Sequence, residues 1–349
     1  MRSSHSPLLD NIETSYQPPK IPKSFNINAY GFDSLELLYN FDDIKSMHFY
    51  KVLSYETAIS LYDFADRFTL GERAEKMLVC GNRIGYDENN KIVFANFCRQ
   101  RLCPLCQRRR SLRVFSGFCR VLEQLSEFKF LHLVLTVPNC EPDSLGYTLD
   151  IMQKLSSRLF RLPPLRRAFK GIARCTEVSY NKKTDTFHPH FHCLVCVAKS
   201  YATSRDYVRH KDLRRWWSVL WNLRDTDRPE RIADGAIMLT EEEVNAKDLL
   251  QIFITVADDK ALPEIAKYAV KPLEFEASRT ERAYVLEKLF EGLHGRRLIQ
   301  TYGNIKETFA KLNIDPDGDD EDTNGEPTTI FNWEYSCDTH GFGYFIGEY

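Results

Sequence analysis

A run of alternating histidines, His188-Pro-His190-Phe-His192, constrains the fold of this 349-residue chain more than any other segment. Side chains two residues apart on a β-strand point to the same face of the sheet. An extended run therefore presents the imidazoles of His190 and His192 on one face and turns Phe191 and Cys193 towards the core. The pattern predicts a strand that carries chemistry on one side and packs on the other.

The segments around this run predict an antiparallel sheet. Residues 171–181 and 191–198 are rich in strand-forming side chains and flank the polar loop 182–189, which is typical of a hairpin. Residues 128–137 form a third expected strand that stops at Pro138-Asn139. Helical periodicity is expected at 44–70, 108–128, 144–170, 206–222, 263–271, 281–290 and 304–312. Strands interrupted by helices, with a hairpin, favour an α+β fold: a central antiparallel sheet with flanking helices.

Two imidazoles on one strand face make half of a divalent-metal site. The third ligand is expected on the facing strand of the hairpin, where Glu177 supplies a carboxylate. His188 is the alternative third ligand.

Four of the ten cysteines lie close together in the sequence, at Cys80, Cys98, Cys103 and Cys106. Four thiolates satisfy tetrahedral zinc, and the CxxC turn places two of them side by side. The spacing predicts a small zinc-binding segment with a structural ion, because four thiolates leave no open position for catalysis. Reduced cysteines without a metal are the alternative.

Charge is balanced overall, with 47 basic and 49 acidic residues, but not locally. Residues 99–120 and 154–174 each contain seven basic residues and no acidic one. Two such segments in a nearly neutral chain predict a positive face for a polyanion, and solvated helix faces are the alternative. The acidic stretch 313–330 is expected to be a disordered linker.

Length and hydropathy limit the number of domains and the class of protein that the chain can be. At about 150 residues per domain, the chain is expected to hold about two domains. Its most apolar stretches are much shorter than the ~20 residues of a membrane span, and residues 1–24 lack the apolar core of a secretory signal. A cytoplasmic protein is expected.

A helix at 263–271 places Glu264 and Tyr268 on one face and Lys267 and Lys271 beside them. A phenol flanked by cations and a carboxylate is suited to attack on a phosphodiester. An ordinary amphipathic helix is the alternative reading.

Three motifs in this order resemble those of plasmid rolling-circle replication initiators, which belong to the HUH endonuclease superfamily. They are Leu133-Val-Leu-Thr-Val-Pro-Asn139, the histidine run and Glu264-Ile-Ala-Lys-Tyr-Ala-Val-Lys271. The group of four cysteines and the segment Gly295–Gly303 are similar to that family too, so the resemblance covers roughly residues 80–311.

The resemblance implies a role for each matching residue. His190 and His192 would bind Mg²⁺ or Mn²⁺, and Tyr268 would attack the scissile phosphate to leave a 5′-phosphotyrosine and a 3′-OH primer. Glu264 stands where some relatives have a second tyrosine, so termination by strand transfer would end in hydrolysis by a Glu264-activated water. Lys267 and Lys271 would position the DNA.

The implied fold is the HUH nuclease palm, at 126–312. The other expected regions are an N-terminal arm (1–53), a helical and cysteine-containing DNA-contacting region (54–125), the acidic linker (313–330) and an aromatic C-terminal tail (331–349). Origin DNA is the expected partner, with a host helicase and DNA polymerase, and the arginines expected to contact it are Arg99, Arg101, Arg108, Arg109, Arg110, Arg113, Arg166 and Arg167.

Two other functions fit parts of this pattern. A relaxase or single-strand transposase of the same superfamily shares the chemistry, but relaxases place the tyrosine before the histidines and such transposases are shorter. A zinc-dependent DNA-binding regulator without catalysis is the alternative from another class. It would bind origin DNA without forming a covalent adduct.

Overall fold

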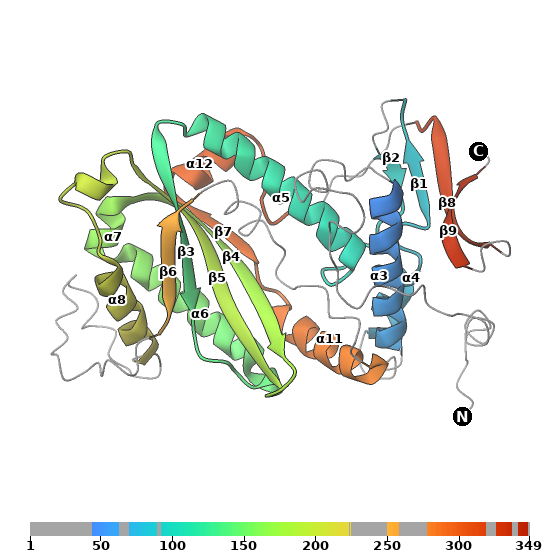
Figure 1. Cartoon of the computed structure of the whole chain (residues 1–349), viewed down its shortest axis with the longest axis horizontal. Helices are drawn as coiled ribbons and strands as arrows, with labels where there is room; N and C mark the ends of the chain where they lie inside the picture. Colours follow the sequence, from blue (N-terminus) through green and yellow to red (C-terminus); the bar gives the residue numbers. More distant parts are fainter. Residues whose placement is uncertain are drawn as a thin grey trace. The chain divides into compact units, whose positions relative to one another are not determined.

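The computed structural model describes residues 44–62, 70–88, 92–222, 224, 250–257, 278–318, 326–336 and 341–347 (Figure 1). The chain forms two compact units. The first contains residues 1–106, 274–278 and 320–349, and the second contains residues 107–273 and 279–319. The expected N-terminal arm up to residue 43 and the expected helix at 263–271 lie outside the described residues.

The second unit is built on a five-stranded antiparallel sheet (Figure 1). The strands lie in the order β6 (Ile252–Val256), β3 (Phe128–Thr136), β5 (Thr186–Ala198), β4 (Phe169–Asn181) and β7 (Ile299–Tyr302). The long β4 and β5 form the expected hairpin, and β3 pairs with β5 over its whole length. The α+β fold with a central antiparallel sheet is confirmed.

Both faces of this sheet are apolar over part of their area. One face packs Leu133, Phe191 and Val195 against α6 (Leu145–Arg161), α7 (Pro163–Ala168) and α8 (His210–Asn222). The other packs Ala173 and Leu194 against α5 (Pro104–Gln124) and α12 (Gly303–Lys311). The described residues of this unit also form two short 3-10 helices, η2 (Pro142–Ser144) and η3 (Tyr201–Thr203), and helix α11 (Arg279–Leu293).

Strand β5 begins at Thr186, several residues before the expected start at 191. The histidine run therefore lies wholly within a strand, although Pro189 lacks a backbone N–H and is unusual inside a sheet. The register explains this. The pairing of β5 with β3 ends at His190, so Pro189 faces a partner only in β4, at Val178.

Helix α12 begins directly at the end of β7, at Gly303. Its φ of 57° lies in the left-handed region, and a Cβ at this position would collide with the carbonyl of Lys170. Glycine therefore allows α12 to start against strand β4.

The first unit joins helices to a second sheet. Helices α3 (Ile44–Tyr62) and α4 (Leu70–Leu78) accompany four strands in the order β2 (Ile92–Ala95), β1 (Arg83–Tyr86), β8 (Thr329–Ser336) and β9 (Gly341–Gly347). The segment expected as an aromatic tail is thus two strands, because β8 pairs with β1 more than 200 residues away in the chain. The compact units also differ from the expected boundaries at residues 53 and 125.

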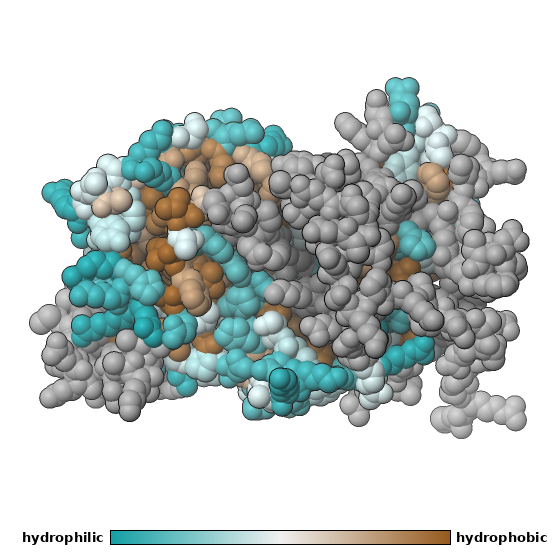
Figure 2. All heavy atoms as spheres, viewed as in Figure 1, coloured by the Kyte–Doolittle hydropathy of each residue, from teal (hydrophilic) through white to brown (hydrophobic). Residues whose placement is uncertain are grey.

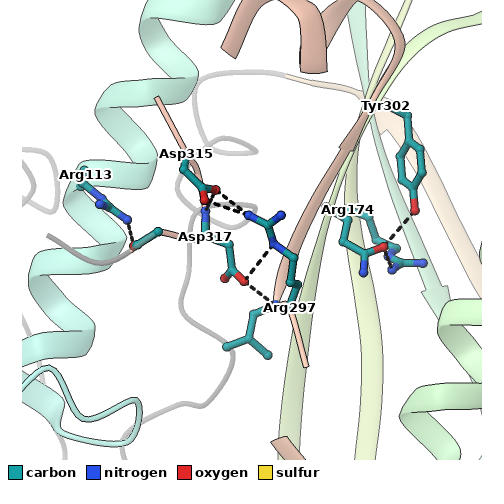
Figure 3. Close-up of polar contacts among 9 residues, drawn as sticks. Arg113, Arg174, Arg297, Tyr302, Asp315 and Asp317 are labelled. Carbon is teal, nitrogen blue, oxygen red and sulfur yellow. Dashed lines mark hydrogen bonds and ion pairs between the residues drawn. The ribbon is translucent and has the colours of Figure 1, made fainter. Parts of the chain in front are cut away.

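The start of the acidic stretch is folded, which corrects the expectation of a disordered linker for residues 313–318. The Asp315 carboxylate accepts hydrogen bonds from Arg297 at 2.7 and 2.9 Å, and Asp317 accepts one from the backbone N–H of Leu298 (Figure 3). Arg113 of α5 donates to the carbonyl of Gly318. The negative charges of Asp315 and Asp317 are therefore balanced by Arg297 of the same unit.

Apolar side chains on the face shown in Figure 2 gather over β6 and the neighbouring part of the five-stranded sheet. On β6, the edge strand, the side chains of Phe253 and Val256 are exposed. Among the described residues, no helix combines the length and apolar character that crossing a membrane requires.

Candidate metal centres

The register of β4, β5 and β3 brings the sequence-predicted divalent site together. Glu177 stands opposite His190, and Cys175 stands opposite His192. Residues directly opposite each other share a face of the sheet. Glu177, His190 and His192 therefore lie on the face that α5 and α12 partly cover. The helices cover the end of this face that contains Ala173 and Leu194, and the polar cluster follows further along the strands.

The three side chains converge on one carboxylate oxygen. Nε2 of His192 lies 3.0 Å from Oε2 of Glu177, and Nε2 of His190 lies 3.5 Å from the same oxygen. The carboxylate is 5% exposed, whereas the two imidazoles are 13% and 11% exposed. We call Glu177, His190 and His192 the Glu-His-His cluster. Its ligand atoms all lie within 4.8 Å of one another.

The electrostatics of the cluster favour an ionised carboxylate. Burial raises the pKa of Glu177, but hydrogen bonds and attraction from His190 and His192 outweigh it and hold that pKa well below its ordinary value. The carboxylate is therefore charged at neutral pH and ready to ligate a cation. Two imidazoles and one carboxylate suit a divalent transition metal or a related ion, and they leave positions open for water or phosphate oxygens.

His188, the alternative third ligand, has a different partner. Its Nδ1 lies 2.9 Å from Oδ1 of Asn139, in the turn that follows β3. Its ring stacks on that of His190, with centroids 5.3 Å apart. The structure therefore brings Glu177 to both histidines and leaves His188 as a flanking residue that holds the turn.

His132 is a residue next to the cluster that the sequence did not single out. Its Nε2 lies 2.9 Å from Nδ1 of His192, and the two rings stack with centroids 5.2 Å apart. The alternation of β3 places His132 on the polar face, but its nearness to His192 depends on the register between β3 and β5. No spacing within the sequence shows this contact.

The four predicted cysteines also come together, in the first unit. Sγ of Cys80 lies 3.6 Å from that of Cys106 and 3.6 Å from that of Cys103, and Cys98 lies 3.7 Å from Cys106. Tetrahedral zinc, with Zn–S bonds of about 2.3 Å, needs sulfurs about 3.8 Å apart. The donor set and spacing fit zinc closely, and all four positions would be filled by protein. We call these residues the four-cysteine cluster.

Polar groups from α3 surround the four-cysteine cluster. Lys51 is buried and donates to the carbonyls of Leu78 and Cys80, and burial lowers its pKa to about 8 although the neighbouring thiolates oppose this shift. Ser54 contacts Sγ of Cys103 and accepts a hydrogen bond from the N–H of Leu105. A buried cation beside thiols stabilises their ionised form, which is the form that binds metal.

The expected nucleophile helix cannot be placed. Glu264, Lys267, Tyr268 and Lys271 lie outside the described residues.

The expected DNA-contacting arginines differ in exposure. Arg99, Arg166 and Arg167 are exposed, whereas Arg110 is 7% exposed and Arg113 is engaged by the Gly318 carbonyl. Arg101, Arg108 and Arg109 are half-buried. Of these three exposed residues, Arg167 forms an ion pair with Asp206 at 3.3 Å.

Comparison with known proteins supports the family resemblance. A family model described as "Replication protein" matches residues 89–338. "Protein rep" of Bacillus amyloliquefaciens is 27% identical over 285 residues, covering 75% of this chain and 83% of that protein. "Protein rep" of Streptococcus pneumoniae serotype 2 is 27% identical, covering 76% of this chain and 78% of that protein.

A third relative, "Protein rep" of Staphylococcus aureus, is 29% identical over 198 residues, covering 56% of this chain and 78% of that protein. No solved structure matches the chain significantly. The family match spans well over half of the chain and includes the histidine run and most of the four-cysteine cluster. The chain therefore belongs to the replication protein family, as its resemblance to plasmid rolling-circle replication initiators predicted.

Proposed function

We propose that this plasmid replication initiator is a metal-dependent nickase of the HUH type, which cuts one strand of its double-strand origin and leaves a 3′-OH for a polymerase. The observation that carries this proposal is the Glu-His-His cluster on a half-covered sheet face in a member of the replication protein family. A cluster with open positions serves a reaction better than it serves stability.

A bound Mg²⁺ or Mn²⁺ would be held by Glu177, His190 and His192 and would polarise the scissile phosphate. The chain's own nucleophile is Tyr268. Its phenol oxygen forms the bond to phosphorus while the bond between phosphorus and the 3′-oxygen breaks. The phenol's proton leaves through a general base, and the 3′-oxygen takes up a proton to become the primer hydroxyl.

The neighbours of Tyr268 in the sequence complete the proposed cycle. Lys267 and Lys271 hold the DNA and balance charge at the phosphate. At termination, Glu264 accepts a proton from a water that hydrolyses a second origin phosphodiester; the 3′-OH so released attacks the phosphotyrosine, joins the strand ends and releases the Tyr268 phenol. Support comes from the order of the three motifs and from their coverage by the family match.

The four-cysteine cluster is proposed to hold a structural Zn²⁺, on the strength of its sulfur spacing and burial. Arg99, Arg166 and Arg167 are proposed to contact origin phosphates, because they are exposed cations. A host helicase and a DNA polymerase are the partners that this role requires, and the cytoplasm is where origin DNA, helicase and polymerase are found.

A nicking assay tests the proposal. The full chain is incubated with labelled single strands that tile the DNA around its own gene, in Mn²⁺ or in EDTA. We expect a nick in Mn²⁺ alone, with a covalent protein–5′-DNA adduct that Tyr268→Phe abolishes. Tyr147→Phe is the matched control, since the Tyr147 side chain is 60% exposed. Cleavage by Tyr268→Phe would contradict the assigned nucleophile, and origin binding without any adduct would favour the regulator.

A further inference from the structure

Both histidines of the Glu-His-His cluster direct the same ring nitrogen towards Glu177. In His190 and in His192, Nε2 faces the carboxylate. Their Nδ1 atoms turn away from the cluster, each towards a different partner. For both rings, Nε2 is therefore the nitrogen that a metal ion bound beside Glu177 would meet.

The Nδ1 partner of His190 is a backbone carbonyl. Nδ1 lies 3.2 Å from the carbonyl oxygen of His188, in the same strand. A carbonyl only accepts hydrogen bonds, so this contact places the proton of a neutral His190 on Nδ1 and leaves the lone pair on Nε2.

The Nδ1 partner of His192 is a side chain from another strand. Nε2 of His132 lies 2.9 Å away, and the two rings are nearly parallel, with an interplanar angle of 23°. His132 of β3 is thus the Nδ1 partner of His192, as the backbone carbonyl of His188 is the Nδ1 partner of His190. An imidazole nitrogen with a free lone pair accepts the Nδ1–H of His192 as the carbonyl does for His190.

Packing alone does not require a histidine at this position. Phe128 and Phe130 precede His132 on the same face of β3 and pack against the apolar cluster under α5. The residues directly opposite His132 are Leu194 in β5 and Thr255 in β6, neither of which carries charge. An apolar side chain would continue this row, whereas the histidine brings a ring nitrogen to Nδ1 of His192.

We propose that His132 is a positioning residue for the metal site: it accepts the Nδ1 proton of His192 and so holds the Nε2 lone pair of that ligand towards the ion. This inference rests on the proposed function, since it takes the Glu-His-His cluster to be the divalent site. Outer partners of metal-bound histidines fix ring orientation and raise ligand basicity, and losing one costs about 10–100-fold in affinity.

The test compares two side chains of similar size at position 132. Gln keeps an acceptor at the end of the chain, and Met does not. Mn²⁺ affinity of the full-length protein is measured by calorimetry without DNA, after a short EDTA treatment that empties the Glu-His-His cluster and leaves zinc bound. We expect His132→Met to bind Mn²⁺ about 10–100-fold more weakly and His132→Gln to stay within about threefold of the unsubstituted protein.

A spectroscopic measurement separates positioning from a merely structural role. In ¹⁵N-labelled protein, long-range histidine spectra report which ring nitrogen carries the proton. With Mg²⁺ added to saturate the unsubstituted protein, His192 is expected as the Nδ1–H form in that protein and in His132→Gln, and as a mixture with the Nε2–H form that faces Glu177 in His132→Met. His294→Phe, at an exposed position outside the cluster, is the control for losing a histidine.

Each outcome decides a separate point. Equal Mn²⁺ affinity in His132→Met and the unsubstituted protein overturns the role of His132, while Mn²⁺ binding itself upholds the cluster. Equal, severe loss in the Met and Gln variants also overturns it, because His132 would then ligate the ion directly. No Mn²⁺ binding by the unsubstituted protein overturns the proposed function. Melting curves in EDTA establish folding, and His132→Phe replaces a Met variant that fails to fold.

Discussion

The two clusters of this protein use different ligands because they stand in different surroundings. The four-cysteine cluster has four soft ligands, three of them buried, in the small first unit. The Glu-His-His cluster has three harder ligands on strands whose partners already fix the backbone, and its imidazoles retain access to solvent. A closed set suits an ion that holds a fold together, whereas an open set suits an ion that meets a substrate.

The two clusters also differ in how much packing would stabilise the surrounding structure without a bound ion. The polar ligands of the second unit stand on a sheet with large apolar clusters on both faces. The four cysteines come from the end of α4, the loop after β2 and the start of α5, so they link segments rather than lie within one strand. We therefore expect metal loss to unfold the first region and to leave the second folded.

The largest expected effect is the loss of a cysteine ligand. Cys106→Ala should release zinc and unfold the first unit, because a structural zinc site contributes about 10 kcal/mol or more to folding. Cys193→Ala is the control, since Cys193 is equally small and fully buried but lies in the second unit. Metal analysis and limited proteolysis measure both. A Cys106→Ala protein that keeps zinc and resists protease would remove the contrast between the clusters.

Chelation should separate the two sites without any substitution. A short EDTA treatment should reduce nicking to background while zinc stays bound, because an open three-ligand site exchanges its ion more readily than a closed four-thiolate site. Added Mn²⁺ should then restore nicking. Metal content and cleavage, measured on the same samples, check this. If zinc were lost at the same rate as nicking activity, the two sites would release their ions equally readily, contrary to this expectation.

Glu177 and His188, the two residues considered as third ligand of the Glu-His-His cluster, are distinguished by their expected effect on Mn²⁺ binding. Glu177→Gln keeps the shape but removes the charge from a direct ligand, so affinity should fall by at least about a hundredfold, more than the loss of an outer partner. His188→Gln keeps a donor for the side-chain oxygen of Asn139 and should change affinity by less than about threefold. Calorimetry with Mn²⁺ measures both. The reverse order would make His188 the third ligand.

A fall in pH should lower the stability of the metal-free protein through Glu177 of the Glu-His-His cluster. Glu177 has a folded-state pKa below its ordinary value of 4.5, so its contribution to stability is present above pH 4.5 and is lost as the pH falls below it. Melting temperatures from pH 7 to pH 3 should therefore fall more steeply for the unsubstituted protein than for Glu177→Gln. Parallel curves would contradict the depressed pKa.

The smallest expected effect concerns the ion pair at the start of the acidic stretch. Arg297 and Asp315 are 60% and 56% exposed, so Asp315→Asn should cost at most about 1 kcal/mol in the free energy of unfolding. Urea denaturation measures it, with Asp206→Asn as the comparison, since half-buried Asp206 pairs with exposed Arg167. A loss of several kcal/mol would mean that residues 313–318 are a structural part of the second unit.

Much of the fold could be predicted from local sequence patterns. Strand-forming side chains in 128–137, 171–181 and 191–198 predicted the strands, and the spacing of the histidines predicted their shared face, because the side-chain period of a strand is two. The same patterns failed where long-range pairing decides. The aromatic C-terminal segment forms β8 and β9 against β1, and no local period indicates a partner so far away in the chain.

The candidate site divides in the same way. The histidine run, the CxxC turn and the facing Glu177 are local or hairpin features, so the sequence by itself determined which residues offer ligands. Only the tertiary structure decided that Glu177 reaches both histidines, that His188 turns to Asn139 and that His132 meets His192. These contacts depend on the register between strands and on the turn after β3, and a register is set by the packing of whole faces rather than by any one segment.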